Sequence, residues 1–240
     1  MANKDTHFAD YLKKYCTPIV EEVLNGMREN RHRVGDMKPA LVPKNPVLYR
    51  WWFPENSPAM KELRKFAIKN TEFANLLRQV ETFTEGNTTY YALYFGKAVK
   101  GYRRFVQHAT GNVHISTIRH TLYGLCYEQK YDKNKEKDIT EMLKECYYEW
   151  YSFQNEGELV ECIESICIAL GKYPLNIDGN PAIGQKWQEK ITDLKEDKKQ
   201  TTVLSKNLFA CFSFSFSAYP LQVAAISRNV RLRKRMQERR

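Results

Sequence analysis

The sequence predicts an α+β fold in which helices flank a small central β-sheet. Aromatic residues, which favour strands, cluster around Tyr49, Tyr94 and Trp150. Between these clusters lie stretches whose apolar residues recur every three or four positions, as on the buried face of a helix. The chain has 240 residues, 42% hydrophobic and 28% charged, which is enough for one elaborated domain or two small ones with a real core.

The first half of the chain provides two strands. Residues 1–45 hold an amphipathic stretch and a basic, proline-containing link, and we expect a helical N-terminal extension there. A strand is expected around Tyr49, and a second over residues 90–97, ending near a glycine. Residues 60–80 have helical spacing, so the region 54–86 is expected to be a helical insert that leaves a hairpin and rejoins it.

Helices and a third strand are expected further along. Helical segments are predicted around Arg104 and over residues 117–127, the second capped by Ser116, and residues 132–138 are expected to be a charged loop. A third strand is predicted over residues 146–153, followed by a helix that ends at Gly171. In a C-terminal extension over residues 181–240, phenylalanine and serine alternate within 208–221 and predict another strand.

Seven spaced residues have side chains suited to metal-assisted cleavage of a phosphodiester bond. That reaction requires an anion to be held, a water to be deprotonated and developing charge to be neutralised. The candidates are Tyr49, Tyr94, Lys97, Arg104, His108, Glu164 and Asn176. His108 follows Arg104 by four positions, which places both on one helix face, and Glu164 flanks the apolar stripe of its own helix.

The order and spacing of these residues resemble the active site of the GIY-YIG endonuclease superfamily. Arg104 follows Tyr94 by ten positions and Lys97 by seven, as in members of that family. Asn176 follows Glu164 by twelve positions, in a segment similar to the family's Pro-x-Asn close. The Arg104 and His108 pair is most similar to the type II restriction endonuclease branch.

The resemblance implies a fold, an activity and a role for each residue. The sheet would be antiparallel, and residues 46–180 would form a nuclease domain that cuts double-stranded DNA with Mg²⁺ or Mn²⁺. Glu164 would bind the metal and Arg104 the scissile phosphate, while Tyr49 and His108 are rival candidates for the general base. Lys97 would favour the ionised form of Tyr49, Tyr94 would support the phosphate or the water, and Asn176 would brace the site.

The chain also departs from the family pattern. Val47-Leu48-Tyr49 replaces Gly-Ile-Tyr, and Tyr94-Phe95-Gly96 replaces Tyr-Ile-Gly. In addition, 44 residues separate the two tyrosines, where compact members have about ten. The insert over 54–86 accounts for this difference.

Charge and composition point to an intracellular protein that meets nucleic acid. The net charge is +10, of which residues 228–240 supply +6. Residues expected to contact phosphates there are Arg228, Arg231, Arg233, Lys234 and Arg235. The six cysteines show no zinc-ligand spacing and are expected to be free thiols, and neither a signal peptide nor a membrane helix is predicted.

Other functions remain open on the sequence alone. The chain could be a nucleic-acid-binding protein that keeps the fold without cutting, or an interaction protein whose aromatic and helical surfaces meet another chain. Among nucleases, repair and mobile-element roles compete with restriction. The recognition sequence, the cut position and the oligomeric state, including a dimer, are not predicted.

Overall fold

The structure is a computed structural model that describes residues 3–127, 132–154 and 157–176. The chain divides into two compact units, one formed by Glu22–Asp197 and the other by Met1–Glu21 with Lys198–Arg240. All strands of the described residues belong to the larger unit.

The described elements alternate between helices and strands. The helices are α1 (Asn3–Arg28), η1 (Pro39–Leu41), α2 (Pro58–Lys69), α3 (Thr71–Arg78), α4 (Gly101–Thr110), α5 (Thr117–Cys126), α6 (Lys133–Lys144) and α7 (Gly157–Leu170). The strands are β1 (His32–Arg33), β2 (Val47–Pro54), β3 (Thr82–Glu85), β4 (Thr88–Ala98) and β5 (Tyr147–Ser152).

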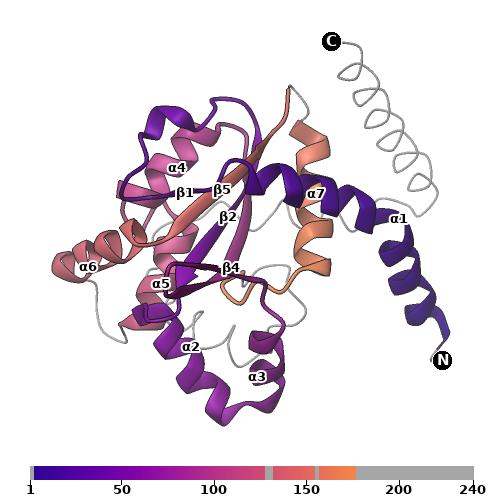
Figure 1. Cartoon of the computed structure of the whole chain (residues 1–240), viewed down its shortest axis with the longest axis horizontal. Helices are drawn as coiled ribbons and strands as arrows, with labels where there is room; N and C mark the ends of the chain where they lie inside the picture. Colours follow the sequence, from indigo (N-terminus) through magenta and orange to yellow (C-terminus); the bar gives the residue numbers. More distant parts are fainter. Residues whose placement is uncertain (1–2, 128–131, 155–156, 177–240) are drawn as a thin grey trace. The chain divides into compact units, whose positions relative to one another are not determined.

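The strands form one antiparallel sheet in the order β1-β5-β2-β4-β3 (Figure 1). Strand β2 is central, and all eight of its residues are buried. Helices lie on both faces of the sheet, which explains why β2 reads as a nearly continuous apolar run rather than an alternation. The predicted α+β fold with a small antiparallel sheet flanked by helices is confirmed.

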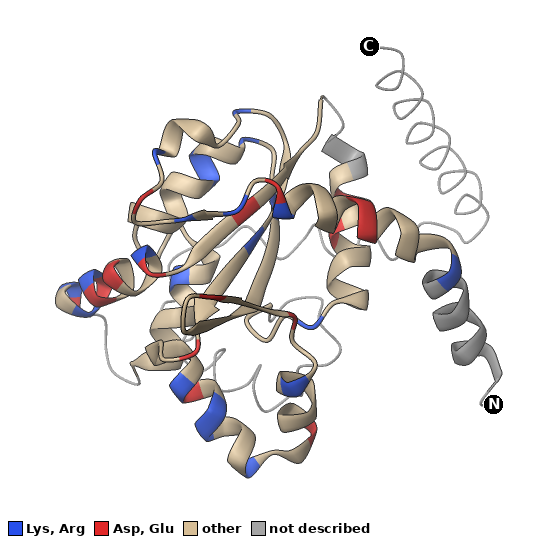
Figure 2. Cartoon of the chain, in the orientation of Figure 1, with Lys and Arg blue, Asp and Glu red and all other residues tan. Residues whose placement is uncertain are grey.

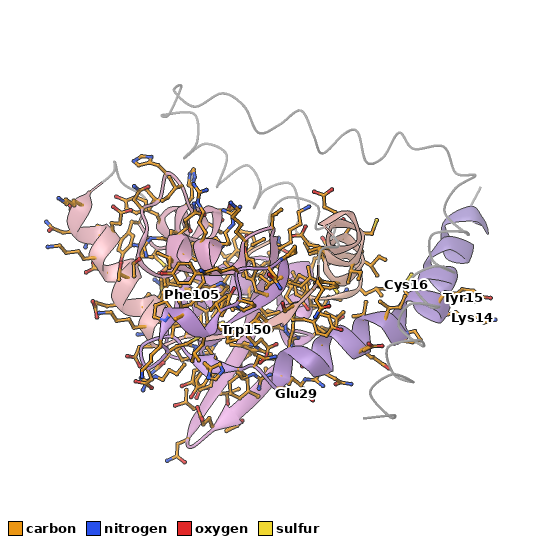
Figure 3. The ribbon with its side chains drawn as sticks, turned by 90° about the horizontal axis from the view of Figure 1, so that it is seen from above. Lys14, Tyr15, Cys16, Glu29, Phe105 and Trp150 are labelled. Carbon is orange, nitrogen blue, oxygen red and sulfur yellow. The ribbon has the colours of Figure 1, made fainter. Side chains whose placement is uncertain are left out.

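The side chains of alternate β2 residues point to opposite faces of the sheet. Tyr49 and Trp51 point towards α4, where the Trp51 ring stacks on Phe105 with centroids 6.3 Å apart. Figure 3 shows Phe105 and Trp150 among densely packed side chains. Helix α7 packs against β2 and β4, and its carboxylates pair with Lys97, the cross-strand partner of Leu48.

Part of one edge of β4 is covered by the segment around Asn176 instead of by a strand. Strand β3 pairs only with Thr88–Tyr91, so the rest of β4 has no strand partner on that side in the described chain. The Asn176 side chain takes its place: its Oδ1 accepts from the Phe95 N–H at 2.8 Å, and its Nδ2 donates to the Phe95 carbonyl at 2.6 Å. The Leu175 N–H adds a bond to the Leu93 carbonyl. Edge amides that would otherwise be unpaired are thereby satisfied.

Two short helices and a strand occupy the long interval between the site tyrosines. The helical segment expected over 60–80 is broken at Asn70, whose Oδ1 accepts from the Phe73 N–H at 3.0 Å and caps α3. Ser57 caps α2 in the same way. The insert leaves at the end of β2 and returns through β3 into β4, so the hairpin itself stays intact.

The prediction of a charged loop over 132–138 is wrong. Asp132 accepts from the Asn134 N–H and caps α6, whose first two turns include those residues. The reason is further along the chain: Ile139, Met142 and Leu143 are buried at helical spacing, and the charged residues form the solvated side of the same helix.

A buried cluster of charges lies on the sheet face opposite to Tyr49. Arg50 and Glu149 are cross-strand partners, fully buried, and form an ion pair at 2.5 Å. Arg31 binds the second oxygen of Glu149 at 2.7 Å, and Glu81 binds Arg50 at 2.6 Å. The cluster therefore ties the chain after α1 and the start of β3 to the centre of the sheet.

Some predictions fall outside the described residues. These are the strand over 208–221, the basic segment 228–240 and the C-terminal extension from 181, and the proposed domain boundaries stay a prediction. Among the helices that are described, none has the length and apolar character needed to cross a membrane.

Candidate active site

The Tyr49 hydroxyl stands at the start of a buried hydrogen-bonded chain. Tyr49 Oη lies 2.7 Å from His108 Nε2, and His108 Nδ1 lies 2.7 Å from Ser116 Oγ. His108 is fully buried, and Tyr49 is only 2% exposed. Strand β2, helix α4 and the first residue before α5 thus contribute one group each.

The Tyr49 hydroxyl has room because its cross-strand partner is a glycine. A Cβ at Gly96 would lie 2.7 Å from Tyr49 Oη and 2.8 Å from Cζ. Such distances are sub-van der Waals, so a side chain at Gly96 would push the tyrosine ring away. The glycine of the Tyr94-Phe95-Gly96 motif therefore lets the hydroxyl lie over β4.

Hydrogen-bond accounting at Ser116 favours one direction for this hydrogen-bonded chain. Ser116 Oγ already accepts from the Arg119 N–H as the α5 cap, and among the described residues the acceptor left for its buried hydroxyl proton is His108 Nδ1. A buried donor left without an acceptor costs about 1–3 kcal/mol. Neutral histidine has one donor and one acceptor, so Nε2 then carries the proton and donates to Tyr49 Oη.

Electrostatics determine the charge of these groups rather than the tautomer of His108. Burial lowers the pKa of His108 well below its ordinary value, and the charges of Arg104 and Arg119 lower it further. Burial also raises the pKa of Tyr49 well above its ordinary range; Tyr94 adds to this, and Arg104 opposes it. The imidazole is therefore neutral and a poor proton acceptor, while Arg104 is the cation that favours an ionised Tyr49.

The second tyrosine and the arginine belong to the same neighbourhood. The rings of Tyr49 and Tyr94 stack with centroids 6.3 Å apart, and Tyr94 meets His108 edge-on at 6.2 Å. Arg104 is half-buried, one helical turn before His108 on α4. Its charge also acts on the buried Tyr148, whose hydroxyl is not hydrogen-bonded in the described chain.

Lys97 contacts the acidic residues of α7. Its Nζ lies 2.6 Å from a Glu161 oxygen and 3.4 Å from a Glu164 oxygen. The sequence predicts that Lys97 tunes Tyr49, but its ion pairs are to these carboxylates. Lys97 therefore links β4 to Glu164 and helps to fix that carboxylate at the side of the site.

Glu164 can serve as a ligand to a hard cation, although not alone. Burial raises the pKa of Glu164 even though Lys97 acts to lower it, so its negative charge is incompletely compensated. Its side chain keeps 18% exposure. Within the part of the chain that the structure describes, no three His, Cys, Asp or Glu side chains gather into a metal site. The donor set fits an Mg²⁺ or Mn²⁺ ion that completes its shell with water and a substrate oxygen.

Asn176 is close to the site through the backbone. By holding both the N–H and the carbonyl of Phe95, it fixes the strand residue between Tyr94 and Gly96. The structure thus brings Tyr49, Tyr94 and His108 into contact, pairs Lys97 with Glu164, and connects Asn176 to the same stretch of β4.

Sequence reasoning missed three residues of this neighbourhood. Ser116 is predicted only as a cap, and its contact to His108 has no local signal. Tyr148 packs its ring on Tyr49 at 5.5 Å, but it reads as one aromatic among several in β5. Arg119 is fully buried and binds the carbonyls of His108 and Ala109 at the end of α4. In the sequence Arg119 is a basic residue three positions after the Ser116 cap, and nothing local indicates that it is buried.

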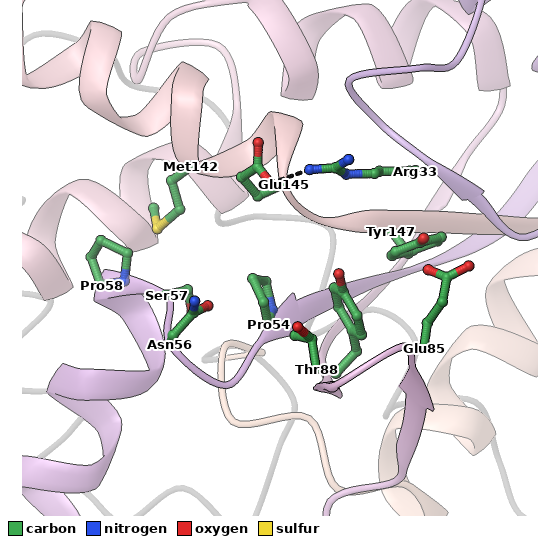
Figure 4. A pocket seen from close by; sticks show the side chains of 11 residues that line it. Arg33, Pro54, Asn56, Ser57, Pro58, Glu85, Thr88, Met142, Glu145 and Tyr147 are labelled. Carbon is green, nitrogen blue, oxygen red and sulfur yellow. Dashed lines mark hydrogen bonds and ion pairs between the residues drawn. The ribbon is translucent and has the colours of Figure 1, made fainter.

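A separate pocket lies at the other end of β2 (Figure 4). It has a volume of about 430 Å³, is lined by Pro54, Ser57 and Tyr90 among others, and holds none of the seven candidates. Arg33 pairs with Glu145 beside it. Pro54 is five strand positions from Tyr49, a distance of roughly 17 Å, so this pocket is distinct from the candidate site.

The fold and the site define a nuclease-type domain. The GIY-YIG catalytic domain model matches residues 47–199, well over half of the chain, and the chain belongs to that family of nucleases. No curated protein and no solved structure matches the chain.

Proposed function

We propose that this protein is a metal-dependent endonuclease that hydrolyses phosphodiester bonds in double-stranded DNA. The observation that carries the proposal is the 2.7 Å contact between Tyr49 Oη and His108 Nε2, within range of the charges of Arg104 and Glu164. A phenol, a guanidinium and a carboxylate are the groups that deprotonate a water, hold a phosphate and bind a hard cation.

The proposed roles follow from access and charge. Arg104 holds the scissile phosphate and stabilises the charge that develops on it. Tyr49 acts as the phenolate, which the charge of Arg104 favours, and its Oη accepts the proton of the attacking water. The water oxygen forms the new bond to phosphorus as the bond to the leaving oxygen breaks. His108 is fully buried and acts through Tyr49, because its Nε2–H stabilises the phenolate. Tyr94 orients the phosphate or the water.

Glu164 would hold the cation, with Lys97 keeping the carboxylate in place. A bound Mg²⁺ or Mn²⁺ supplies positive charge to the phosphate and the leaving oxygen. Asn176 maintains the backbone of β4 between Tyr94 and Gly96. Each role concerns a group in or next to the site.

Restriction of foreign DNA is the setting we favour. The Arg104 and His108 pair is similar to restriction-type members, and the structured insert of α2, α3 and β3 offers a surface for reading sequence. The basic segment 228–240 would add affinity without sequence information, through contacts to phosphates.

The test is digestion of plasmid and genomic DNA by the purified chain with Mg²⁺, Mn²⁺ or a chelator. We expect cleavage only with metal, and mapped ends that share one short sequence. Scattered ends would favour a repair or mobile-element role. Duplex binding with no cleavage under either metal would overturn the enzymatic proposal and leave a nucleic-acid-binding protein that keeps the fold.

A further inference from the structure

One flank of α4 carries a line of basic and polar side chains. Arg103, Arg104 and Gln107 lie on one side of α4, and Lys100, the N-cap residue immediately before the helix, precedes Arg104 by four positions. We call these four residues the α4 ridge. The buried residues of the helix, including Phe105 and His108, lie on the adjacent face.

The ridge runs outward from the candidate site. Arg104 and Gln107 are half-buried, whereas Lys100 and Arg103 are exposed. Neither Lys100 nor Arg103 forms an ion pair with any residue that the structure describes, whereas Lys97 near the end of β4 pairs with Glu161. Two exposed cations thus continue a line that begins at the arginine proposed to hold the scissile phosphate.

The surrounding sequence contains no acid that could neutralise the ridge. Between Glu85 and Glu128 there is no Asp or Glu, while five Lys and Arg residues occur. This segment and residues 228–240 carry +5 and +6, so the rest of the chain is nearly neutral against a total of +10. Figure 2 shows α4 with basic positions and no acidic one. The positive charge is therefore concentrated rather than spread.

A neighbouring segment adds one more cation to the first turn of α4. The Gly101 N–H donates to the Asn45 carbonyl at 3.1 Å, and the Tyr102 N–H donates to the Pro43 carbonyl at 2.8 Å. The exposed Lys44 lies between those two acceptors in the chain. The backbone of this basic link is therefore held against the beginning of the ridge.

We propose that the α4 ridge contacts the backbone phosphates beside the scissile phosphate of a DNA duplex. The inference rests on the proposed nuclease function and adds the surface that holds the substrate. Lys100 and Gln107 are seven residues apart, about 10 Å along the helix. Phosphates of one strand advance about 3.4 Å along the duplex axis per nucleotide, so the ridge matches about three nucleotides.

The test compares two double variants that remove equal charge. Lys100→Ala with Arg103→Ala removes the exposed part of the ridge. Lys133→Ala with Lys137→Ala is the matched control, because both lysines are exposed on α6 and neither forms an ion pair in the described chain. Binding to two duplexes of unrelated sequence is measured by fluorescence anisotropy with a chelator present, over a series of salt concentrations.

The ridge variant should bind at least about tenfold more weakly at low salt. Its plot of log K against log salt should be less steep by about 2, since each lost phosphate contact removes roughly 0.9 from the slope. The loss should be equal on both duplexes, and the control should keep the wild-type slope. If the wild-type chain binds and cuts DNA but the ridge variant keeps the wild-type slope, the proposal that the ridge contacts phosphates is wrong and the proposed nuclease function stands. If the wild-type chain does not bind duplex DNA, both the ridge proposal and the proposed nuclease function are wrong.

Discussion

Both ring nitrogens of His108 are engaged, and this determines what the residue can do. Nε2 contacts Tyr49 and Nδ1 contacts Ser116, with no exposure of the side chain to solvent. A histidine without access to water cannot take a proton from the nucleophile itself. Its effect has to pass through Tyr49, and the tautomer set by Ser116 decides whether that effect stabilises the phenolate.

Ser116 offers a matched pair of substitutions. Ser116→Thr keeps both the cap and the hydroxyl, whereas Ser116→Gly keeps most of the cap and removes the hydroxyl, since Gly and Thr cap helices about equally well. We expect Ser116→Gly to slow single-turnover cleavage by about tenfold to a hundredfold, the range seen when a partner that orients a functional group is lost. Ser116→Thr should stay close to wild type.

Nitrogen-15 NMR of the histidine rings provides a readout that a general loss of packing would not mimic. The wild-type chain should show the proton of His108 on Nε2, and Ser116→Gly should show at least partial transfer to Nδ1. A wild-type proton on Nδ1 would contradict the assigned direction of the hydrogen bonds.

The buried His108 should also make stability depend on pH. Its pKa in the folded chain is well below the ordinary value because of burial, so the unfolded chain binds this proton at a higher pH than the folded one. Stability is therefore lost as the pH falls below about 6.5, by at most about 1.4 kcal/mol per pH unit from this group.

The measurement is urea denaturation of wild type and His108→Gln between about pH 7.5 and pH 5.5. The variant lacks the titrating group, so the difference in free energy of unfolding between the two proteins should shrink or reverse as the pH falls. A difference that stays constant with pH would show that His108 keeps an ordinary pKa in the folded chain.

At the scale of elements, the buried charge cluster ties β2 to β5. Arg50 and Glu149 face each other across these strands, with no exposure of either side chain. A shift of β5 by one residue against β2 would move Glu149 to the opposite face, among the aromatic rings around Tyr49, and leave Arg50 without its counter-charge. The pair therefore favours the register that also places Tyr49 opposite Trp150.

Removing one charge of this pair should be costly. Glu149→Gln leaves Arg50 buried without its main counter-charge and should lower the free energy of unfolding by about 3 kcal/mol or more. Glu141→Gln is the control, because Glu141 pairs with Lys144 on the exposed side of α6 and should cost less than about 0.5 kcal/mol. Equal, small losses in urea denaturation would mean that the cluster adds nothing to stability.

Elements with a strong local pattern could be predicted from the sequence. The aromatic strands around Tyr49, Tyr94 and Trp150 and the helix that carries Glu164 were all found. The strands β1 and β3 were not, because two and four residues are too short to show an alternation. The start of α6 was not predicted as helix because most of its residues are charged. Local composition cannot reveal elements whose existence depends on tertiary partners.

The same limit applies to the candidate site, because a local pattern does not show which residues contact one another. The seven residues were predicted from the resemblance of their order and spacing to the GIY-YIG family. Their pairings could not be read from spacing: Lys97 binds α7 rather than Tyr49, and the cation that acts on Tyr49 is Arg104. Contacts across 64 or 67 sequence positions, as between Lys97 and the acids of α7, arise only in the folded chain.

At the scale of the catalytic domain, the candidate site takes its residues from β2, β4, α4 and α7. The Asn176 segment satisfies the edge of β4, and α4 and α7 contribute Arg104 and Glu164 on either side. The central claim is that this site cleaves DNA and that Glu164 is required for the chemistry rather than for folding. Single-turnover cleavage of supercoiled plasmid in Mg²⁺ tests it most directly.

The comparison uses wild type, Tyr49→Phe, Glu164→Ala and Glu161→Ala, the last removing an exposed acid one turn earlier on α7. We predict at least about a hundredfold slower cleavage for Tyr49→Phe and Glu164→Ala, with duplex affinity and thermal unfolding close to wild type, and only a small effect of Glu161→Ala. A folded Glu164→Ala variant that cuts as fast as the wild-type chain would contradict the account.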